Sequence, residues 1–345
     1  MKGVLLVNIG TPDTPEPKNV AKYLRQFLMD EEVMNIPYLL RWFLVNGIIV
    51  PFRRHHSARL YKSIWMDGDS PLRLHLAELT HLVKSFTLDK KIIVRYGMRY
   101  GNPSLSERID KMHQKGVKDL LVILLYPQQT GSTVLSSFKY VEDTIQNKHY
   151  DINSSYIYAF YQDELYQECI LKSVKESLFD SEKHSRLLFT YHGVPISHLP
   201  CPKQVANRCN DNWYGCIWKG EKYENCYRYQ CYKSTEELAE KLDLQANNYE
   251  TVFQSRLGKG TWLKPYFSER LQELPAENVK DIAVIAPSFT QDCLETLHEI
   301  KTEGQAIFRQ AGGKEYVYIP CLNDNEDWAF VISQWINCWS YNSKY

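Results

Sequence analysis

The stretch LLFTYHGVP, residues 187–195, decides the fold class of this chain. It is a short apolar run that ends on His192 and is closed by Gly193 and Pro195. Such a run is typical of a buried strand in a parallel sheet, whose carboxyl end opens into a loop where α/β proteins bind ligands. A histidine at that edge can exchange a proton near neutral pH or ligate a metal. The alternative is that His192 only bonds a backbone group of the loop.

Strand and helix patterns alternate on both sides of this stretch. The polar segment 146–155 separates two comparable halves. This alternation predicts an α/β fold with two similar, doubly wound parallel sheets. We place the N-terminal domain at 1–150 and the C-terminal domain at 151–345, and expect the last helix, about 325–339, to pack on the N-terminal half. Strands are expected at 2–8, 91–96, 119–125, 156–161, 186–191, 251–254 and 281–286, with helices at 17–29, 72–86, 104–116 and 163–179.

Composition excludes several classes of function. The chain has 345 residues, which favours two domains over a single core. Its 41 basic and 41 acidic residues cancel, so no electrostatic argument for nucleic-acid binding exists. No GxGxxG motif follows the first strand, which disfavours a dinucleotide-binding enzyme. Residues 1–8 turn polar too soon for a secretory signal, so a cytoplasmic protein is expected.

The segment 36–56 is the longest apolar tract of the chain. It contains Arg41 and Asn46 and is broken by prolines and a glycine, so it is not expected to span a membrane. Basic residues and histidines follow its apolar side chains. That combination predicts an interfacial patch, giving peripheral membrane contact, or the lip of an apolar pocket. A plain buried helix and loop is the alternative.

Five of the nine cysteines lie within 31 residues, in an apparent insertion at about 199–231. Disulfides are not expected in a cytoplasmic chain, which leaves metal binding or redox chemistry. The spacing contains no CxxC pair of the kind that zinc sites usually show, so we favour a 2Fe–2S cluster, with zinc as the alternative. The cysteines are Cys201, Cys209, Cys216, Cys226 and Cys231.

A second cluster of candidate residues follows the strand expected at 281–286. On a regular helix, Asp292, Glu295 and Glu299 fall at i, i+3 and i+7 and form one acidic stripe. Three neighbouring carboxylates can pass protons or a divalent cation. A solvated acidic face is the alternative. His192 and this stripe both follow carboxyl ends of strands in one half, which favours their proximity.

Six motifs, taken together, resemble those of one known family. They are LLVNIGTP at 5–12, YGMRY at 96–100, YPQ at 126–128, YHGVP at 191–195, FQSR at 253–256 with Trp262, and DCLETL at 292–297. In this order they are similar to the motifs of ferrochelatases, lyases that insert Fe²⁺ into a porphyrin to complete haem. The resemblance covers nearly the whole chain.

The resemblance implies two flavodoxin-like, chelatase-type halves that enclose a porphyrin cleft, with the tract 36–56 as its lip. It implies that protoporphyrin IX takes up Fe²⁺, with release of two protons, to give protohaem. Insertion into coproporphyrin is the nearest alternative. A non-catalytic iron–sulfur sensor or electron-transfer protein on the same scaffold is the alternative from another class.

The resemblance also implies roles for individual residues. His192 becomes the active-site histidine, as proton acceptor or iron ligand. Glu295 is catalytic with it, and Asp292 and Glu299 complete the acidic side of the iron and proton path. The residues implied to contact the porphyrin are Ile9, Arg99, Tyr126, Ser132 and Trp262.

Two departures from the family pattern affect this assignment. Cys293 stands where some relatives have a second histidine, so no role for that histidine transfers. Cys231 resembles a cysteine of the ordinary family pattern, whereas the other four lie in the extra segment. We therefore expect Cys201, Cys209, Cys216 and Cys226 to hold the cluster, with Cys231 in place of Cys201 as the nearest alternative.

Overall fold

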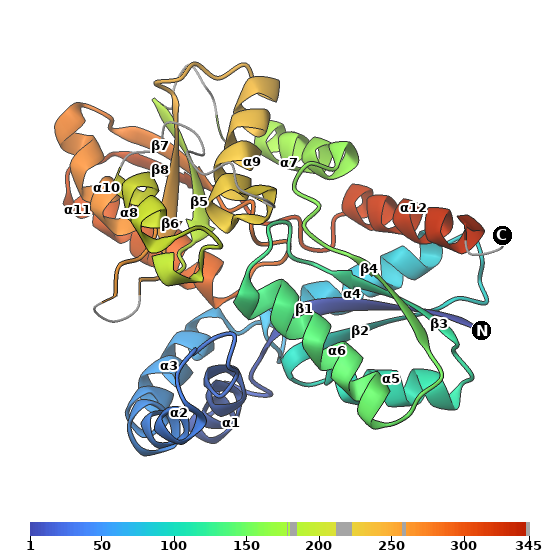
Figure 1. The fold of residues 1–345 in the computed structure, drawn as a ribbon. Helices are drawn as coiled ribbons and strands as arrows, with labels where there is room; N and C mark the ends of the chain where they lie inside the picture. The colour runs from blue at the N-terminus through green and yellow to red at the C-terminus, as the bar shows by residue number, and fades with distance from the viewer. Residues whose placement is uncertain (178, 180–184, 212–222, 257–259, 343–345) are drawn as a thin grey trace. The chain divides into compact units, whose positions relative to one another are not determined.

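The computed structural model describes residues 1–177, 179, 185–211, 223–256 and 260–342. The chain divides into two compact units. Unit 1 comprises Met1–Tyr126, Thr130–Tyr158 and Asn323–Tyr345, and unit 2 comprises Pro127–Gln129 and Ala159–Leu322. Each unit contains a four-stranded parallel sheet among its described residues (Figure 1).

The sheet of unit 1 has the strand order β2-β1-β3-β4, with its strands in parallel. Apolar residues at alternate positions of β1 and β3 face α5 and α6 in one core cluster, which includes Leu5, Val7 and Leu120. On β1 and β2 the sheet also contacts α4, and α12 packs on α4. The strands are β1 (Lys2–Thr11), β2 (Ile93–Gly101), β3 (Asp119–Leu124) and β4 (Asn153–Ile157).

The helices of unit 1 begin where local chemistry favours them. The Ser70 side chain accepts a hydrogen bond from the Arg73 N–H, and Pro71 occupies the first turn of α4. The helices are α1 (Pro17–Leu28), α2 (Tyr38–Phe43), η1 (Leu44–Ile49), α3 (Val50–Ile64), α4 (Pro71–Phe86), α5 (Leu105–Gln114), η2 (Gly131–Leu135), α6 (Ser136–Asn147) and α12 (Glu326–Asn342). Of these, η1 and η2 are π-helical.

The strand β4 differs from the sequence prediction. We expected a strand at 156–161 opening the second half, but β4 begins at Asn153 and pairs with β3 in the first sheet. It is an edge strand whose residues are exposed or half-buried. An edge strand tolerates polar side chains, so the serines near the start of β4 give no apolar pattern from which the strand could be predicted.

The sheet of unit 2 has the order β6-β5-β7-β8, again parallel. Its central strand β5 is the stretch on which the sequence analysis opened. Leu188, Val252 and Val284 point into a core cluster with residues of α10, α11 and η6. The strands are β5 (Arg186–His192), β6 (Tyr249–Gln254), β7 (Asp281–Ile285) and β8 (Glu315–Tyr318).

On the other face of this sheet, α9 contacts β6, and α7 contacts α9. Tyr191 and Thr235 join β5 to α9 through their hydroxyl oxygens, 2.9 Å apart. The helices of unit 2 are α7 (Glu164–Glu176), η3 (Ile196–His198), α8 (Lys203–Asp211), η4 (Tyr223–Asn225), α9 (Tyr227–Lys241), α10 (Phe267–Glu273), η5 (Leu274–Glu277), η6 (Glu295–Gly304) and α11 (Gln305–Gln310).

The tract 36–56 folds into α2, η1 and the start of α3. Seven of its large apolar side chains are exposed: Tyr38, Leu39, Leu40, Trp42, Phe43, Ile48 and Phe52. The alternative of a plain buried helix and loop is therefore wrong for this tract. In the part of the chain that the structure describes, no helix combines the length and apolar character needed to cross a membrane.

Candidate active site

His192 is the last residue of β5 and pairs in register with Gln254 of β6. Because side chains alternate along a strand, His192 faces the same side of the sheet as Leu188, which is the side that η6 and α11 cover. The ring Nδ1 lies 2.7 Å from the carbonyl oxygen of Gly193. A carbonyl can only accept, so Nδ1 donates, and the neutral ring carries its lone pair on Nε2.

The loop after His192 is fixed by several backbone contacts. The Gly193 N–H donates to the Gln254 carbonyl at 2.7 Å, and the Tyr227 hydroxyl donates to the His192 carbonyl at 2.8 Å. Pro195 forms an antiparallel bridge with Trp262. A Cβ atom on residue 193 would meet the Trp262 ring at 3.5 Å. The structure thus brings Trp262 beside the histidine loop.

The acidic residues lie on a segment that is joined to the neighbouring strand. The Ser255 hydroxyl donates to Glu299, and Ser255 directly follows Gln254, the register partner of His192. Asp292 is 4% exposed, and its Oδ1 accepts from the Thr296 hydroxyl at 2.9 Å and from the Tyr318 hydroxyl. Asp292 is therefore held in place.

The geometry of this segment differs from the regular helix we expected. Asp292 precedes the helix, and Glu295–Gly304 forms a π-helix, whose hydrogen bonds run from i to i+5. The predicted i, i+3, i+7 stripe of a regular helix therefore does not describe how Asp292, Glu295 and Glu299 are arranged. Cys293 precedes Glu295 by two residues. Burial raises the pKa of the Cys293 thiol, and the Glu295 charge raises it further, so this thiol stays protonated at neutral pH.

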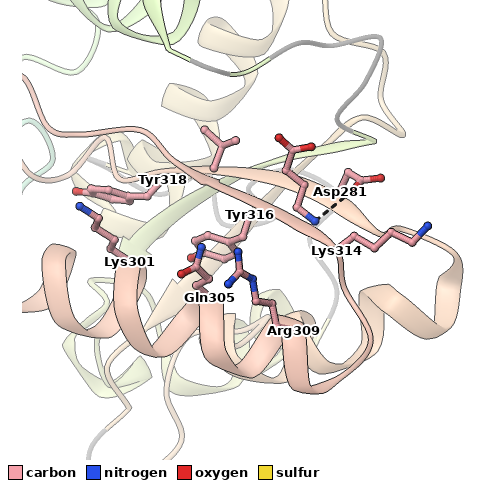
Figure 2. A pocket seen from close by; sticks show the side chains of 9 residues that line it. Asp281, Lys301, Gln305, Arg309, Lys314, Tyr316 and Tyr318 are labelled. Carbon is pink, nitrogen blue, oxygen red and sulfur yellow. Dashed lines mark hydrogen bonds between the residues drawn. The ribbon is translucent and has the colours of Figure 1, made fainter.

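A pocket of about 670 Å³ lies on another part of unit 2 (Figure 2). Lys301, Gln305 and Arg309 project into it from η6 and α11, opposite Tyr316 and Tyr318 of β8. Neither His192 nor Glu295 lines it. Tyr318, which lines it, donates to Asp292.

In unit 1, three of the predicted porphyrin contacts lie at the carboxyl edge of the sheet. Ile9 lies between Asn8 and Gly10, which pair with β2 on either side of Arg99. Tyr126 follows the end of β3, and its buried hydroxyl lies 3.4 Å from the Ser137 hydroxyl. The fourth, Ser132, is in η2, with its hydroxyl 3.1 Å from that of Thr130.

Four of the five clustered cysteines lie in the described residues. Cys201 precedes α8, Cys209 lies within it, Cys226 caps α9 and Cys231 lies inside α9. Cys216 lies outside the described residues. Among those that are described, no group of three or more His, Cys, Asp or Glu side chains is arranged to hold a metal ion.

Sequence reasoning missed residues that hold the candidate side chains. Ser255 was visible inside the motif FQSR, but its contact with Glu299 spans 44 residues. Tyr318 lies 26 residues from Asp292, and Asp30 lies 69 residues from its partner Arg99. Such contacts follow from strand order, and no local pattern signals them.

Comparison with solved structures supports the class of fold. The structure titled SirB from Bacillus subtilis with Fe³⁺ matches with a TM-score of 0.52 at 11% identity, covering 98% of this chain and 96% of that one. Two parallel four-stranded sheets, with a histidine at a strand end, thus define an α/β protein that shares its fold with that structure.

Sequence comparison gives the family. The ferrochelatase family model matches residues 1–338. The ferrochelatase of Bdellovibrio bacteriovorus is 39% identical, with 95% of this chain and 96% of the relative covered. That of Idiomarina loihiensis is 36% identical, with 97% and 86% covered. The chain belongs to the ferrochelatase family. It is a metal chelatase that inserts Fe²⁺ into a porphyrin for haem synthesis.

Proposed function

We propose that the natural porphyrin is protoporphyrin IX and that His192 removes its pyrrole protons. The reaction exchanges two pyrrole protons for one Fe²⁺, so it needs a base at the nitrogens and a path for the dehydrated cation. The observation that supports His192 as this base is the hydrogen bond from its Nδ1 to Gly193, which leaves Nε2 as a proton acceptor.

Glu295, Asp292 and Glu299 form the acidic side of this reaction. Glu295 and Glu299 are half-buried at the start of η6, where carboxylates can replace water around Fe²⁺ and take up protons. Asp292 accepts from two hydroxyls, which hold its carboxylate in a fixed position at the start of this path. We assign catalysis to His192 and Glu295. The path for iron and protons is formed by these two residues together with Asp292 and Glu299.

The porphyrin contacts that we propose are Ile9, Arg99, Tyr126, Ser132 and Trp262. Ile9, Arg99 and Tyr126 support this by lying at the carboxyl edge of the sheet in unit 1, where Ser132 lies in η2. Trp262 supports it by lying beside the histidine loop in unit 2. A binding surface that favours a bent macrocycle would expose the nitrogen lone pairs and so lower the barrier to insertion.

An anaerobic assay with Fe²⁺ and either protoporphyrin IX or coproporphyrin tests the choice of substrate. We expect a higher kcat/KM for protoporphyrin IX. A higher kcat/KM for coproporphyrin would overturn that choice while leaving the chelatase chemistry intact. Absence of insertion with both porphyrins would refute the proposed roles of the site residues.

We also propose that Cys201, Cys209, Cys216 and Cys226 hold a 2Fe–2S cluster. The support is the chemistry of the donors: thiols crowded into a short segment of the sequence. Burial raises the pKa of the Cys231 thiol, which disfavours Cys231 as a thiolate ligand. Bound, such a cluster would supply one-electron chemistry or a structural brace.

Iron and acid-labile sulfide analysis of anaerobically purified protein tests this assignment. We expect a 2Fe–2S visible spectrum that is lost in Cys201→Ser and kept in Cys231→Ser. If the spectrum is lost in Cys231→Ser and kept in Cys201→Ser, Cys231 is a ligand in place of Cys201. Bound zinc without sulfide would refute the cluster.

We propose further that the protein works in the cytoplasm and touches the membrane surface through the tract 36–56. Leu39 and Phe52 are 81% and 79% exposed, and the basic Arg53 and Arg54 follow them. An apolar face flanked by cations suits an anionic lipid surface. Flotation with anionic vesicles tests this: Phe52→Ser should weaken binding, and wild-type protein that stays unbound would refute it.

A further inference from the structure

Asp30 and Arg99 form an ion pair in unit 1 that is largely withdrawn from solvent. Asp30 follows α1, and Arg99 lies on β2. The Arg99 side chain is 14% exposed and the Asp30 side chain 6%. Burying two charges is costly, so a pair in this position needs further hydrogen bonds or a function.

Asp30 is satisfied almost entirely from within the protein. Its Oδ2 accepts from Arg99 Nη2, from the Tyr100 hydroxyl at 2.8 Å and from the Ser136 hydroxyl at 2.7 Å. Burial alone would raise the pKa of Asp30, but the hydrogen bonds from Ser136 and the Glu32 N–H, with the Arg99 charge, hold it below 3.8. Asp30 is thus a carboxylate at neutral pH.

Arg99 is fixed on several sides, but one of its donors has no protein partner. Its Nε donates to the Ser136 hydroxyl at 2.8 Å, and its guanidinium lies 4.5 Å and 4.3 Å from the ring centres of Tyr100 and Tyr140. Across the described ranges, no protein acceptor bonds Nη1. The Ser136 hydrogen bond and the two tyrosine rings fix the guanidinium, so Arg99 presents Nη1 in a fixed orientation.

The fixed guanidinium lies near another candidate contact. Arg99 Nε donates to the Ser136 hydroxyl, and the Tyr126 hydroxyl lies 3.4 Å from that of Ser137, the next residue. Arg99 and Tyr126 therefore act on the same region at the carboxyl edge of the sheet.

We propose that Asp30 is a positioning residue for porphyrin binding: it holds the Arg99 guanidinium so that Nη1 can donate to the porphyrin. This rests on the proposed contact between Arg99 and the porphyrin. Asp30 itself has its oxygens occupied and does not touch the substrate. The role requires that Asp30 act only through Arg99.

A double-mutant cycle tests this requirement. Porphyrin affinity is measured by fluorescence titration for Asp30→Asn, Arg99→Gln and the double variant, with KM and kcat for insertion of Fe²⁺. We expect each single change to weaken porphyrin binding about tenfold. In the kinetics, the KM for porphyrin should rise accordingly, while kcat changes less than about threefold. The double variant should bind no more weakly than Arg99→Gln.

Asp110→Asn is the matched control, because Asp110 accepts from Lys148 at 2.6 Å and from Tyr150 at 3.1 Å elsewhere in unit 1. It should lose stability without losing porphyrin affinity. Additive losses in the double variant, or normal affinity in Asp30→Asn alone, would overturn the inference and leave Arg99 as a contact. Normal affinity in Arg99→Gln would overturn the proposed contact and the inference with it.

Discussion

The Nδ1 of His192 donates a hydrogen bond to the carbonyl of Gly193, its own neighbour in sequence. The Gly193 N–H in turn donates to the Gln254 carbonyl. The ring orientation is therefore tied to the backbone at the end of β5, and Nε2 is left as the acceptor. This relationship is the basis of our proposal that His192 acts as the general base.

Gly193→Ala should disturb this orientation. An added Cβ would lie 2.8 Å from the Gln254 carbonyl oxygen, which is backbone and cannot move aside. We expect a loss of about 1–3 kcal/mol in unfolding free energy and a marked fall in kcat. Gly116→Ala is the control: its φ of +79° strains a side chain, but the space around it is open, so stability should fall while kcat is kept. Equal kcat in both variants would show that the loop position is not critical.

Glu295→Gln should impair insertion more than porphyrin binding. Removing the charge deprives the iron and proton path of an acceptor but leaves the shape of the side chain unchanged. We expect kcat to fall by about 10²-fold or more, with the porphyrin dissociation constant changed less than about threefold. Steady-state kinetics and fluorescence titration measure the two effects. Unchanged kcat would remove Glu295 from the mechanism.

Ser255→Ala should act through Glu299. The Ser255 hydroxyl donates to the Glu299 carboxylate, so its loss frees that carboxylate from the end of β6. We expect a rise in the KM for Fe²⁺ of about three- to tenfold with little change in the KM for porphyrin. Ser85→Ala, which removes a hydroxyl bonded only within α4, should change neither value. A rise in the porphyrin KM instead would place Ser255 in a different role.

Asp30 should contribute to stability in a pH-dependent way. Its folded pKa lies below 3.8, so the stabilisation is present above about pH 4 and is lost as the pH falls toward the folded pKa. Urea unfolding from pH 7 downward measures it. Wild-type protein should lose more stability below about pH 4 than Asp30→Asn does. Parallel curves for the two proteins would contradict the lowered pKa.

Much of the fold was predictable because apolar strands alternate with amphipathic helices. β5 and β7 are short apolar runs that end in polar loops, and their positions match the prediction within a few residues. β4 was misplaced because an edge strand needs no apolar signature. The π-helix at Glu295 was not predictable, since its local sequence differs little from that of an ordinary helix.

The site was predictable only as a set of separate side chains. His192, Trp262 and Glu299 could be named from motifs, but Ser255 and Asp30, which hold Glu299 and Arg99, could not. These supporting residues act across long sequence separations that only the strand order brings close. The sequence therefore indicates candidate groups for the chemistry, and the structure shows which side chains hold them.

His192→Ala tests the central claim most directly, in an anaerobic assay of Fe²⁺ insertion into protoporphyrin IX. Loss of the base should lower kcat by about 10²–10⁴-fold while porphyrin binding and the unfolding transition are kept. His81→Ala, which removes an exposed histidine of α4, should insert iron normally. Normal turnover by His192→Ala, with bound porphyrin and an intact fold, would contradict the account.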